Sequence, residues 1–316
     1  MLQLVPSDPR AAGAALRGLA VFERGWLSSN NVLVHGDGEG AALIDSSHCL
    51  HAEQTIALVR AALGGEPLHC VLNTHLHSDH CGGNAALQSE FGARVLVPAV
   101  SLDAVQRWDD ELLSFRATGQ RAERFTAQGT LTPGEELALG VRSWLVIGAP
   151  GHDPQSVMLF DAAEGILISA DALWENGFGV VFPELDGLDA FDDVESVLKS
   201  IERLPVQWVV PGHGAVFSDV DGALRRARSR LAGFRADPPR HARHGAKVLI
   251  KYHLMEEQQQ TPVAFESWLG EVPLLRRIWA RLGHPDASLS GWGERLVGEL
   301  VDGGALSRRE DVLYNA

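Results

Sequence analysis

The stretch NTHLHSDHCGGN, residues 73–84, places three imidazoles and one carboxylate within six consecutive positions. It follows the apolar run that ends at Asn73, which is typical of a buried strand. In an extended loop His75 and His77 point the same way, because side chains alternate with a period of two. Asp79 and His80, at the turn into the next helix, can face a second point nearby. The two glycines permit the tight backbone path that this turn needs.

Imidazole and carboxylate are ligands that zinc and iron accept, and a catalytic site keeps one position open for water. Four local groups cannot complete two metal sites. Further along the chain, an apolar strand or the loop leaving one precedes each of three more candidates, His152, Asp171 and His213. We expect these three side chains to join the first four.

The rest of residues 1–235 indicates two β-rich halves, each followed by helices. In the first half, Leu2–Val5 is a short apolar run, and a glycine-containing turn joins Asn31–His35 to Ala41–Asp45. Helical spacing follows over 56–63 and 83–91. In the second half we expect strands at 137–139, 143–147, 155–160, 165–169 and 206–210, and a helix over 191–201. This layout predicts two sheets packed face to face with helices outside.

The complete set resembles the metallo-β-lactamase superfamily, whose HxHxDH motif, later histidine, bridging aspartate and final histidine occur here in the same order. The resemblance covers roughly residues 20–215 and implies an α/β fold, an αββα sandwich of two mixed sheets flanked by helices. It assigns one metal ion to His75, His77 and His152, a second to Asp79, His80 and His213, and the bridge to Asp171. Asp45 matches an early acidic position that supports the metal loop.

The resemblance therefore implies two divalent metal ions, with zinc expected and iron or manganese as alternatives. Paired cations lower the pKa of a shared water and generate hydroxide, and one cation can polarise a carbonyl or phosphoryl oxygen. We expect Asp79 to be the catalytic residue as well as a ligand, because a carboxylate there can orient the hydroxide and accept its proton.

Among the activities of the family, the aspartate bridge argues against lactams, since the best-known lactamases have a cysteine at that position. The surroundings of His75 and His152 are most similar to the glyoxalase II branch of thioester or ester hydrolases. Two departures, Asp153-Pro154 after His152 and Ala170 before Asp171, blur the subfamily. The only tyrosines, Tyr252 and Tyr314, are in the C-terminal part, which argues against a lactonase.

Three alternatives to the thioester or ester hydrolase stay open. One is a lactonase or phosphodiesterase of the same superfamily. Another is a module that retains the metals but acts in ligand binding or signalling. The third is an iron enzyme of the persulfide dioxygenase type, which would use only His75, His152 and Asp171 and leave the other ligands unexplained.

Two regions interrupt or extend the plan. We expect a catalytic domain over residues 1–235, with a helical insertion over residues 100–126. We expect the prolines at 238–239 to mark a linker over residues 236–241. Residues 241–316 are expected to form a helical or winged-helix-like domain. Two further groups are each interpreted as a solvated helix face. One consists of Lys247, Lys251 and Tyr252. The other consists of Arg225, Arg226, Arg228 and Arg230.

Composition limits the partners. A net charge of −14 disfavours nucleic acid and suits a small-molecule substrate, while a homodimer stays open. No apolar run reaches the roughly 18 residues of a membrane helix, so we expect a cytoplasmic protein. Three cysteines without CxxC pairing are interpreted as reduced thiols. Two interpretations stay open for the aromatic residues Trp174, Phe178 and Phe182, with Trp108 and Phe115: they wall and cover the site, or they belong to the ordinary core.

Overall fold

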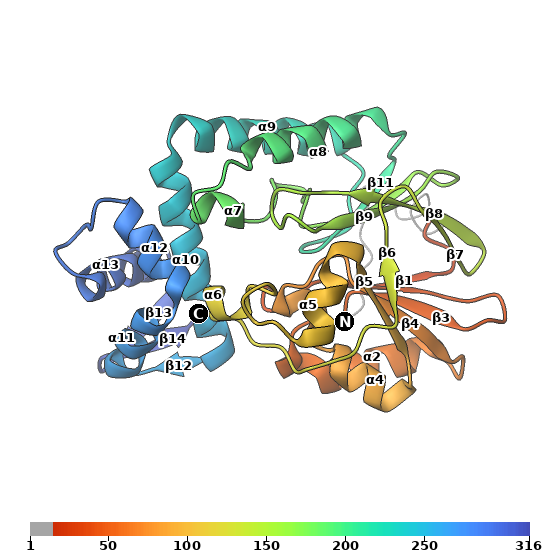
Figure 1. Cartoon of the computed structure of the whole chain (residues 1–316), viewed down its shortest axis with the longest axis horizontal. Coiled ribbons are helices and arrows are strands. Elements are labelled where there is room, and N and C mark those ends of the chain that lie inside the picture. Colours follow the sequence, from red (N-terminus) through yellow and green to blue (C-terminus); the bar gives the residue numbers. More distant parts are fainter. Residues whose placement is uncertain (1–14) are drawn as a thin grey trace.

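The computed structural model describes residues 15–316, so the expected strand Leu2–Val5 lies outside the described residues. Two β-sheets pack face to face, and helices cover their outer faces (Figure 1). This is the αββα sandwich that the sequence predicted. No helix among the described residues is long and apolar enough to cross a membrane.

The first sheet has six strands in sequence order. They are β1 (Leu19–Phe22), β2 (Asn31–Val34), β3 (Ala41–Ile44), β4 (Leu68–Leu72), β5 (Arg94–Pro98) and β6 (Gly129–Leu131). The hairpin of β2 and β3 confirms the turn expected between them, and β3 to β6 run parallel. The helices α2 (Ala52–Leu63) and α4 (Asn84–Phe91) supply the crossovers that parallel strands require.

The second sheet has five strands in the order β11, β10, β9, β8, β7. Their bounds are β7 (Glu136–Leu139), β8 (Arg142–Gly148), β9 (Val157–Asp161), β10 (Ile166–Ala170) and β11 (Trp208–Pro211). All pairs are antiparallel except β10 with β11. The helices α8 (Phe191–Arg203) and α9 (Val220–Ala236) cover its outer face (Figure 1).

The core follows the two-residue period of the strands. In β4, Leu72 faces the opposite sheet, while its neighbour Val71 faces the helices. The layer between the sheets includes Ile44, Ile168 and the fully buried Trp144. Because both faces of the central strands are buried, these strands are apolar throughout, and the polar groups are confined to their ends.

The C-terminal part begins at once after α9. Only Asp237 separates α9 from α10 (Pro238–Glu257), so the two prolines start a helix and do not form a linker. Proline fits the first helical turn, whose N–H groups have no partner within the helix. The linker expected over 236–241 was therefore wrong, and the division into domains at 235 and 241 stays a prediction.

Three further helices and a small sheet complete the chain. They are α11 (Pro262–Glu271), α12 (Pro273–Arg281), α13 (Leu289–Asp302), β12 (Gln259–Gln260), β13 (Leu306–Arg309) and β14 (Val312–Asn315). The hairpin of β13 and β14 after α13 has the helix-then-wing form expected from the sequence. Helices α10 to α13 and the hairpin of β13 and β14 share one apolar cluster with Leu185 of α7 (Phe182–Leu185), a helix that follows β10 in the chain. The C-terminal part therefore packs on the sandwich.

The expected insertion over 100–126 is only partly helical. It contains a 3-10 turn (Ala99–Ser101) and the short helices α5 (Leu102–Arg107) and α6 (Phe115–Thr118). Trp108 and Gly119 follow these helices in the left-handed conformation, at φ of 54° and 72°, and each ends its helix there.

Candidate metal centre

The seven expected ligands come from the carboxyl-terminal edges of both sheets. The loop after β4 carries His75 and His77 and leads into α3 (Ser78–Cys81), which carries Asp79 and His80. His152 follows β8, Asp171 follows β10 and His213 follows β11. Since β3 and β4 are parallel, as are β10 and β11, their carboxyl ends meet at one edge. The structure brings all seven side chains together there.

Three histidines form the first group. The ring nitrogens His75 Nε2 and His77 Nδ1 are 3.0 Å apart, and His77 Nδ1 is 2.8 Å from His152 Nε2. The other nitrogen of His152, Nδ1, lies 2.6 Å from the carbonyl oxygen of Val180, which therefore accepts its proton and fixes the ring. Nε2 of His152 is then left free to bind a cation.

The second group consists of Asp79, His80 and His213. Asp79 Oδ2 lies 3.0 Å from His213 Nε2 and 3.7 Å from His80 Nε2. His80 Nε2 is buried and has no hydrogen-bond partner among the described residues. A buried ring nitrogen without a hydrogen bond is costly unless a ligand occupies it, so His80 Nε2, with only carboxylates nearby, fits a metal ligand.

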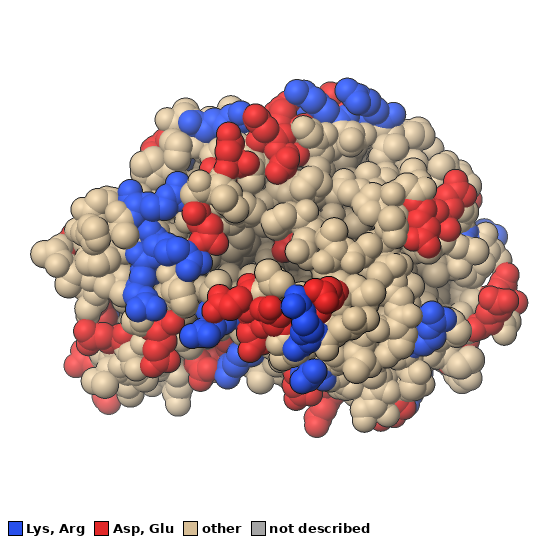
Figure 2. All heavy atoms as spheres, in the orientation of Figure 1, with Lys and Arg blue, Asp and Glu red and all other residues tan. Residues whose placement is uncertain are grey.

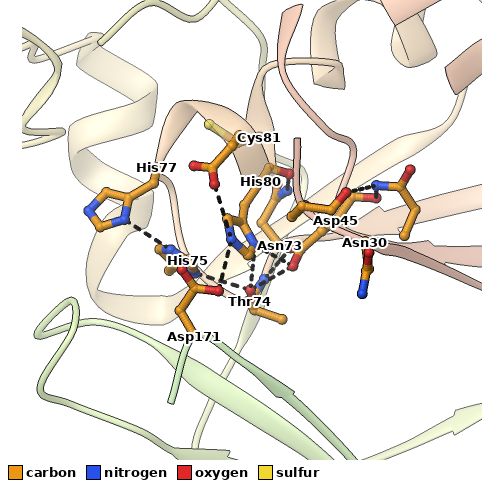
Figure 3. A network of polar contacts seen from close by, with 12 residues as sticks. Asn30, Asp45, Asn73, Thr74, His75, His77, His80, Cys81 and Asp171 are labelled. Atoms are coloured by element: carbon orange, nitrogen blue, oxygen red, sulfur yellow. Dashed lines mark hydrogen bonds and ion pairs between the residues drawn. The ribbon is translucent and has the colours of Figure 1, made fainter. Parts of the chain in front are cut away.

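Asp171 lies between the two groups. Its Oδ2 is 3.4 Å from His152 Nε2, and its Oδ1 is 3.4 Å from His80 Nε2. The Trp174 indole donates to the same Oδ1 at 3.2 Å. Figure 3 shows Asp171 facing His75 and His80 across the site. One carboxylate oxygen thus faces each histidine group, as a bridge between two cations would require.

Electrostatics keep three of the donors, His75, His77 and Asp79, in the form that binds metal. Burial and the neighbouring imidazoles hold the pKa of His75 well below its usual value and lower the pKa of His77 to about 3. Burial alone would raise the pKa of Asp79, but His80 and His213 lower it to about 2. At neutral pH these groups are two free imidazoles and a carboxylate, which need lose no proton to bind a cation.

Asp45 supports the metal loop, as expected. It accepts hydrogen bonds from the Thr74 backbone N–H and hydroxyl, each at 2.8 Å, and from His80 Nδ1 at 2.7 Å (Figure 3). Burial opposes a charge on His80, but the carboxylates of Asp45, Asp79 and Asp171 hold its pKa well above the usual value. The pair orients His80 Nε2 toward the site, and His80 would release a proton on binding a cation there.

Two glycines lie where the backbone passes close to the side chains of the site, and Ala170 departs from the family pattern nearby. A Cβ at Gly212 would lie 2.2 Å from Asp171 Oδ1, and one at Gly179 would lie 2.4 Å from His152 Nδ1. Ala170, where the family usually has glycine, has a φ of 45°. The left-handed backbone favours glycine there, so alanine accepts some strain just before Asp171.

The ligands open into a cavity of about 550 Å³. Its wall includes Trp26, Trp174 and Phe182, and α10 contributes Lys247, Lys251, Tyr252 and Met255. The structure settles one open interpretation and corrects one expectation. Phe178, Trp108 and Phe115 belong to the apolar cores and do not line the cavity. Lys247, Lys251 and Tyr252 line it and do not form a solvated face.

Several cavity residues escaped the sequence analysis. Trp26 stacks on His213 with ring centroids 5.3 Å apart, and no motif marks it. Arg230, expected on a solvated face, and His244 also line the cavity. The residues that α10 contributes recur every three or four positions between 244 and 255, which is the one signal that could have found them.

Known proteins are similar to this chain. The family model of the metallo-beta-lactamase superfamily matches residues 24–213. The chain belongs to the metallo-beta-lactamase superfamily. A hydroxyacylglutathione hydrolase of Anaeromyxobacter dehalogenans is 33% identical over 66% of this chain and 74% of its own length. The similarity to this relative is consistent with the glyoxalase II-like branch, and the chain is a metal-dependent hydrolase.

Two further similar proteins are informative. The human acyl-coenzyme A thioesterase MBLAC2 is 29% identical over 46% of this chain, which spans 55% of that protein's length. The crystal structure of TTHA1623 in a di-iron-bound form has a TM-score of 0.53 at 28% identity, over 66% of this chain and 98% of that one. The match to TTHA1623 therefore leaves about a third of this chain without a counterpart.

Proposed function

We propose that this chain is a dinuclear metal-dependent hydrolase that acts on thioesters. The observation that carries the proposal is the position of Asp171, with Oδ1 3.4 Å from His80 Nε2 and Oδ2 3.4 Å from His152 Nε2. A carboxylate placed in this way can bind one cation with each oxygen. With the shared carboxylate each cation would have four protein ligands, and a catalytic zinc can expand to a fifth position that a water molecule would occupy.

The donor set fits two divalent cations. Two groups of three buried side chains each place their ligand atoms within 4.8 Å of one another. They are His75, His77 and His152, and Asp79, His80 and His213. When bound, two such cations lower the pKa of a water molecule toward neutrality and polarise the substrate carbonyl. Zinc is the expected metal, and the di-iron form of TTHA1623 supports iron as the alternative.

The protein supplies orientation and a proton acceptor. Because its pKa lies at about 2, the carboxylate of Asp79 is ionised at neutral pH and can accept a proton from the attacking water. The hydrogen bonds of Asp45 to His80 and of Val180 to His152 fix both imidazole rings. Trp26 and Trp174, with ring centroids 5.6 Å apart, limit access of bulk water beside His213.

The choice of thioesters rests on the relatives and on the cavity. Relatives named hydroxyacylglutathione hydrolase and acyl-coenzyme A thioesterase both have thioester substrates in their names. The cavity joins an apolar wall, which suits an acyl group, to the cations of α9 and α10, which suit a charged leaving group. A lactone or simple ester is the second candidate, since Tyr252 lines the cavity despite its distance in sequence.

Metal analysis and a substrate panel test this proposal. The purified protein is expected to hold about two zinc, iron or manganese ions per chain and to hydrolyse thioesters faster than lactones, phosphodiesters or β-lactams. Asp79→Asn is expected to lower kcat by at least about 100-fold with folding intact. Asp192→Asn, an exposed residue of α8, is the matched control. A single metal per chain, or hydrolysis that survives metal removal, would contradict the proposal.

A further inference from the structure

Arg230 is a cation without an anionic partner. One of its terminal nitrogens donates to His244 Nε2 at 2.8 Å, and its guanidinium lies over the rings of Phe178 and Phe234, 5.6 and 5.4 Å from their centroids. No ion pair among residues 15–316 includes Arg230. Burial lowers its pKa, so the protein retains this charge at a cost. A ligand anion would offset that cost.

The position of Arg230 links two cavities. With His244 and Lys247 it lines both the metal cavity and an adjoining cavity of about 640 Å³. The second cavity is lined by four cationic side chains, Arg230, Arg240, Arg243 and Lys247, against the two carboxylates of Asp237 and Glu299. Figure 2 shows Lys and Arg side chains gathered over the region of α10 and the C-terminal helices.

The two carboxylates do not neutralise this second cavity. Glu299 is shared, since Arg243 and Lys247 both pair with it, the latter at 3.2 Å. Asp237 caps α10 by accepting from the Arg240 backbone N–H at 3.1 Å. His244 adds no negative charge, because burial and Arg230 lower its pKa to about 4 and leave it neutral. A net positive charge therefore persists beside the metal cavity, in a chain whose overall charge is −14.

The cations extend along the helix. From Arg240 to Lys247, α10 rises about 10 Å, at roughly 1.5 Å per residue. A single carboxylate would use only one end of this series. Several phosphate groups spaced along a chain would use all of it, and the planar guanidinium forms paired hydrogen bonds with phosphate oxygens.

We propose that the substrate is an acyl thioester of a phosphate-bearing thiol, whose phosphates bind in the adjoining cavity between Arg230 of α9 and the cations Arg240, Arg243 and Lys247 of α10. This inference rests on the proposed thioester hydrolysis and names its leaving group. The oxygen of water bonds to the acyl carbon, the carbon–sulfur bond breaks, and the sulfur takes a proton as the thiol leaves. The acyl chain then lies in the metal cavity, and the charged part of the thiol occupies the adjoining one.

The test compares two leaving groups on the metal-loaded full chain. The same acyl group is presented as a coenzyme A thioester and as a glutathione thioester to the wild type and to Arg240→Gln/Arg243→Gln. We expect the variant to raise KM for the coenzyme A thioester on the order of tenfold, with kcat and the glutathione thioester little changed. Arg225→Gln, an exposed residue of α9 outside both cavities, is the control. Equal KM values for both thioesters, or KM values that do not respond to the double variant, would overturn the inference.

A binding measurement separates this inference from the proposed hydrolysis. Adenosine 3′,5′-bisphosphate, which carries phosphates without a thioester, is titrated calorimetrically into the wild type and the double variant. Binding that the double variant weakens supports the phosphate site even if no thioester is hydrolysed, in which case only the proposed function fails. Absent binding by the wild type, together with active hydrolysis, leaves the proposed function standing and refutes the phosphate site.

Discussion

His48 and Glu256 lie 208 positions apart and form a buried ion pair, with His48 Nε2 2.8 Å from Glu256 Oε1. His48 follows β3 closely, three residues after Asp45, and Glu256 lies in the last turn of α10. Arg121 adds a second contact to Glu256 at 3.3 Å. The pair therefore joins the helix that lines the cavity to the loop that supports the metal ligands.

This pair makes stability depend on pH in a defined direction. Burial opposes the charge on His48, but its hydrogen bonds to Cys49 and Glu256 raise its pKa to about 9 from 6.5. A raised pKa in the folded state adds stability that is complete below pH 6.5 and is lost as pH rises through 9. Glu256→Gln should cost about 3 kcal/mol of unfolding free energy at pH 6, and less at pH 9.5.

Urea unfolding of the wild type and the variant at both pH values measures the effect. Glu257→Gln is the matched control, because Glu257 neighbours Glu256 but pairs only with the half-exposed Arg121. The control should lose less than about 1 kcal/mol at either pH. A cost for Glu256→Gln that is the same at pH 6 and pH 9.5 would show that the ion pair is not responsible.

The glycine beside His152 gives a second prediction. A Cβ at Gly179 would lie 2.4 Å from His152 Nδ1 and would displace the ring from its bond to Val180. Gly179→Ala should therefore lower metal affinity about 10- to 100-fold. Gly233→Ala, in α9 with open space around it, should retain the metal and gain up to about 1 kcal/mol of stability. Metal content after dialysis against a weak chelator compares the two, and equal retention would refute the prediction.

Much of this site could be predicted from the sequence because its ligands follow strands. The alternation of side chains fixes which way His75 and His77 point, and parallel strands bring Asp171 and His213 to one edge. Strands with strong apolar runs, such as β4 and β10, were likewise confirmed. The sequence did not predict β5, because it follows α4 after only two residues and is too short for the two-residue alternation of a strand to be recognised.

The cavity wall could not be predicted in the same way. α10 is polar on several faces, so its pattern does not show which face meets the sandwich, and Lys247 was placed in solvent. Arg230 looked like its exposed neighbours Arg226 and Arg228, which do form surface ion pairs. Only tertiary packing, through residues such as Leu185, decides which of these cations faces the substrate.

Removal of metal should destabilise the protein. His77 Nδ1 lies within 3.0 Å of both His75 Nε2 and His152 Nε2 in a buried site, and without a cation the one N–H of a neutral His77 cannot fully satisfy both neighbours. A cation at one hundred times its dissociation constant adds about 2.7 kcal/mol per site. Dialysis against a chelator should lower Tm and abolish hydrolysis, and added zinc should restore both. An unchanged Tm in metal-free protein that has lost hydrolysis would contradict the structural part of this prediction.

Trp26 should select the acyl group. Its indole is 61% exposed, yet it stacks on His213 and meets Trp174 edge to face at the cavity mouth. An acyl chain lying against this ring would bury apolar surface worth about 1.5 kcal/mol, roughly tenfold in affinity. Trp26→Ala should lower kcat/KM for a long acyl thioester about tenfold and leave the acetyl thioester nearly unchanged. An equal loss of kcat/KM for the long acyl thioester and the acetyl thioester would show that Trp26 acts on the metal site and not on the acyl chain.

Tyr252 should affect turnover more than binding. Its hydroxyl lies 2.7 Å from Ser78 Oγ, and Ser78 begins α3 immediately before Asp79. Burial holds the pKa of Tyr252 well above its usual value, so the hydroxyl keeps its proton and can donate at any working pH. Tyr252→Phe removes this hydrogen bond and keeps the ring, so the backbone at Asp79 loses a support while the cavity keeps its shape. We expect kcat to fall about tenfold at unchanged metal content and with KM changed less than twofold, because misplacing a reacting group raises the barrier without weakening substrate binding.

Tyr314→Phe, in β14 and outside the cavity, is the matched control and should match the wild type. Steady-state kinetics with metal analysis decide the matter, and a Tyr252→Phe variant with wild-type kcat would confine this tyrosine to packing.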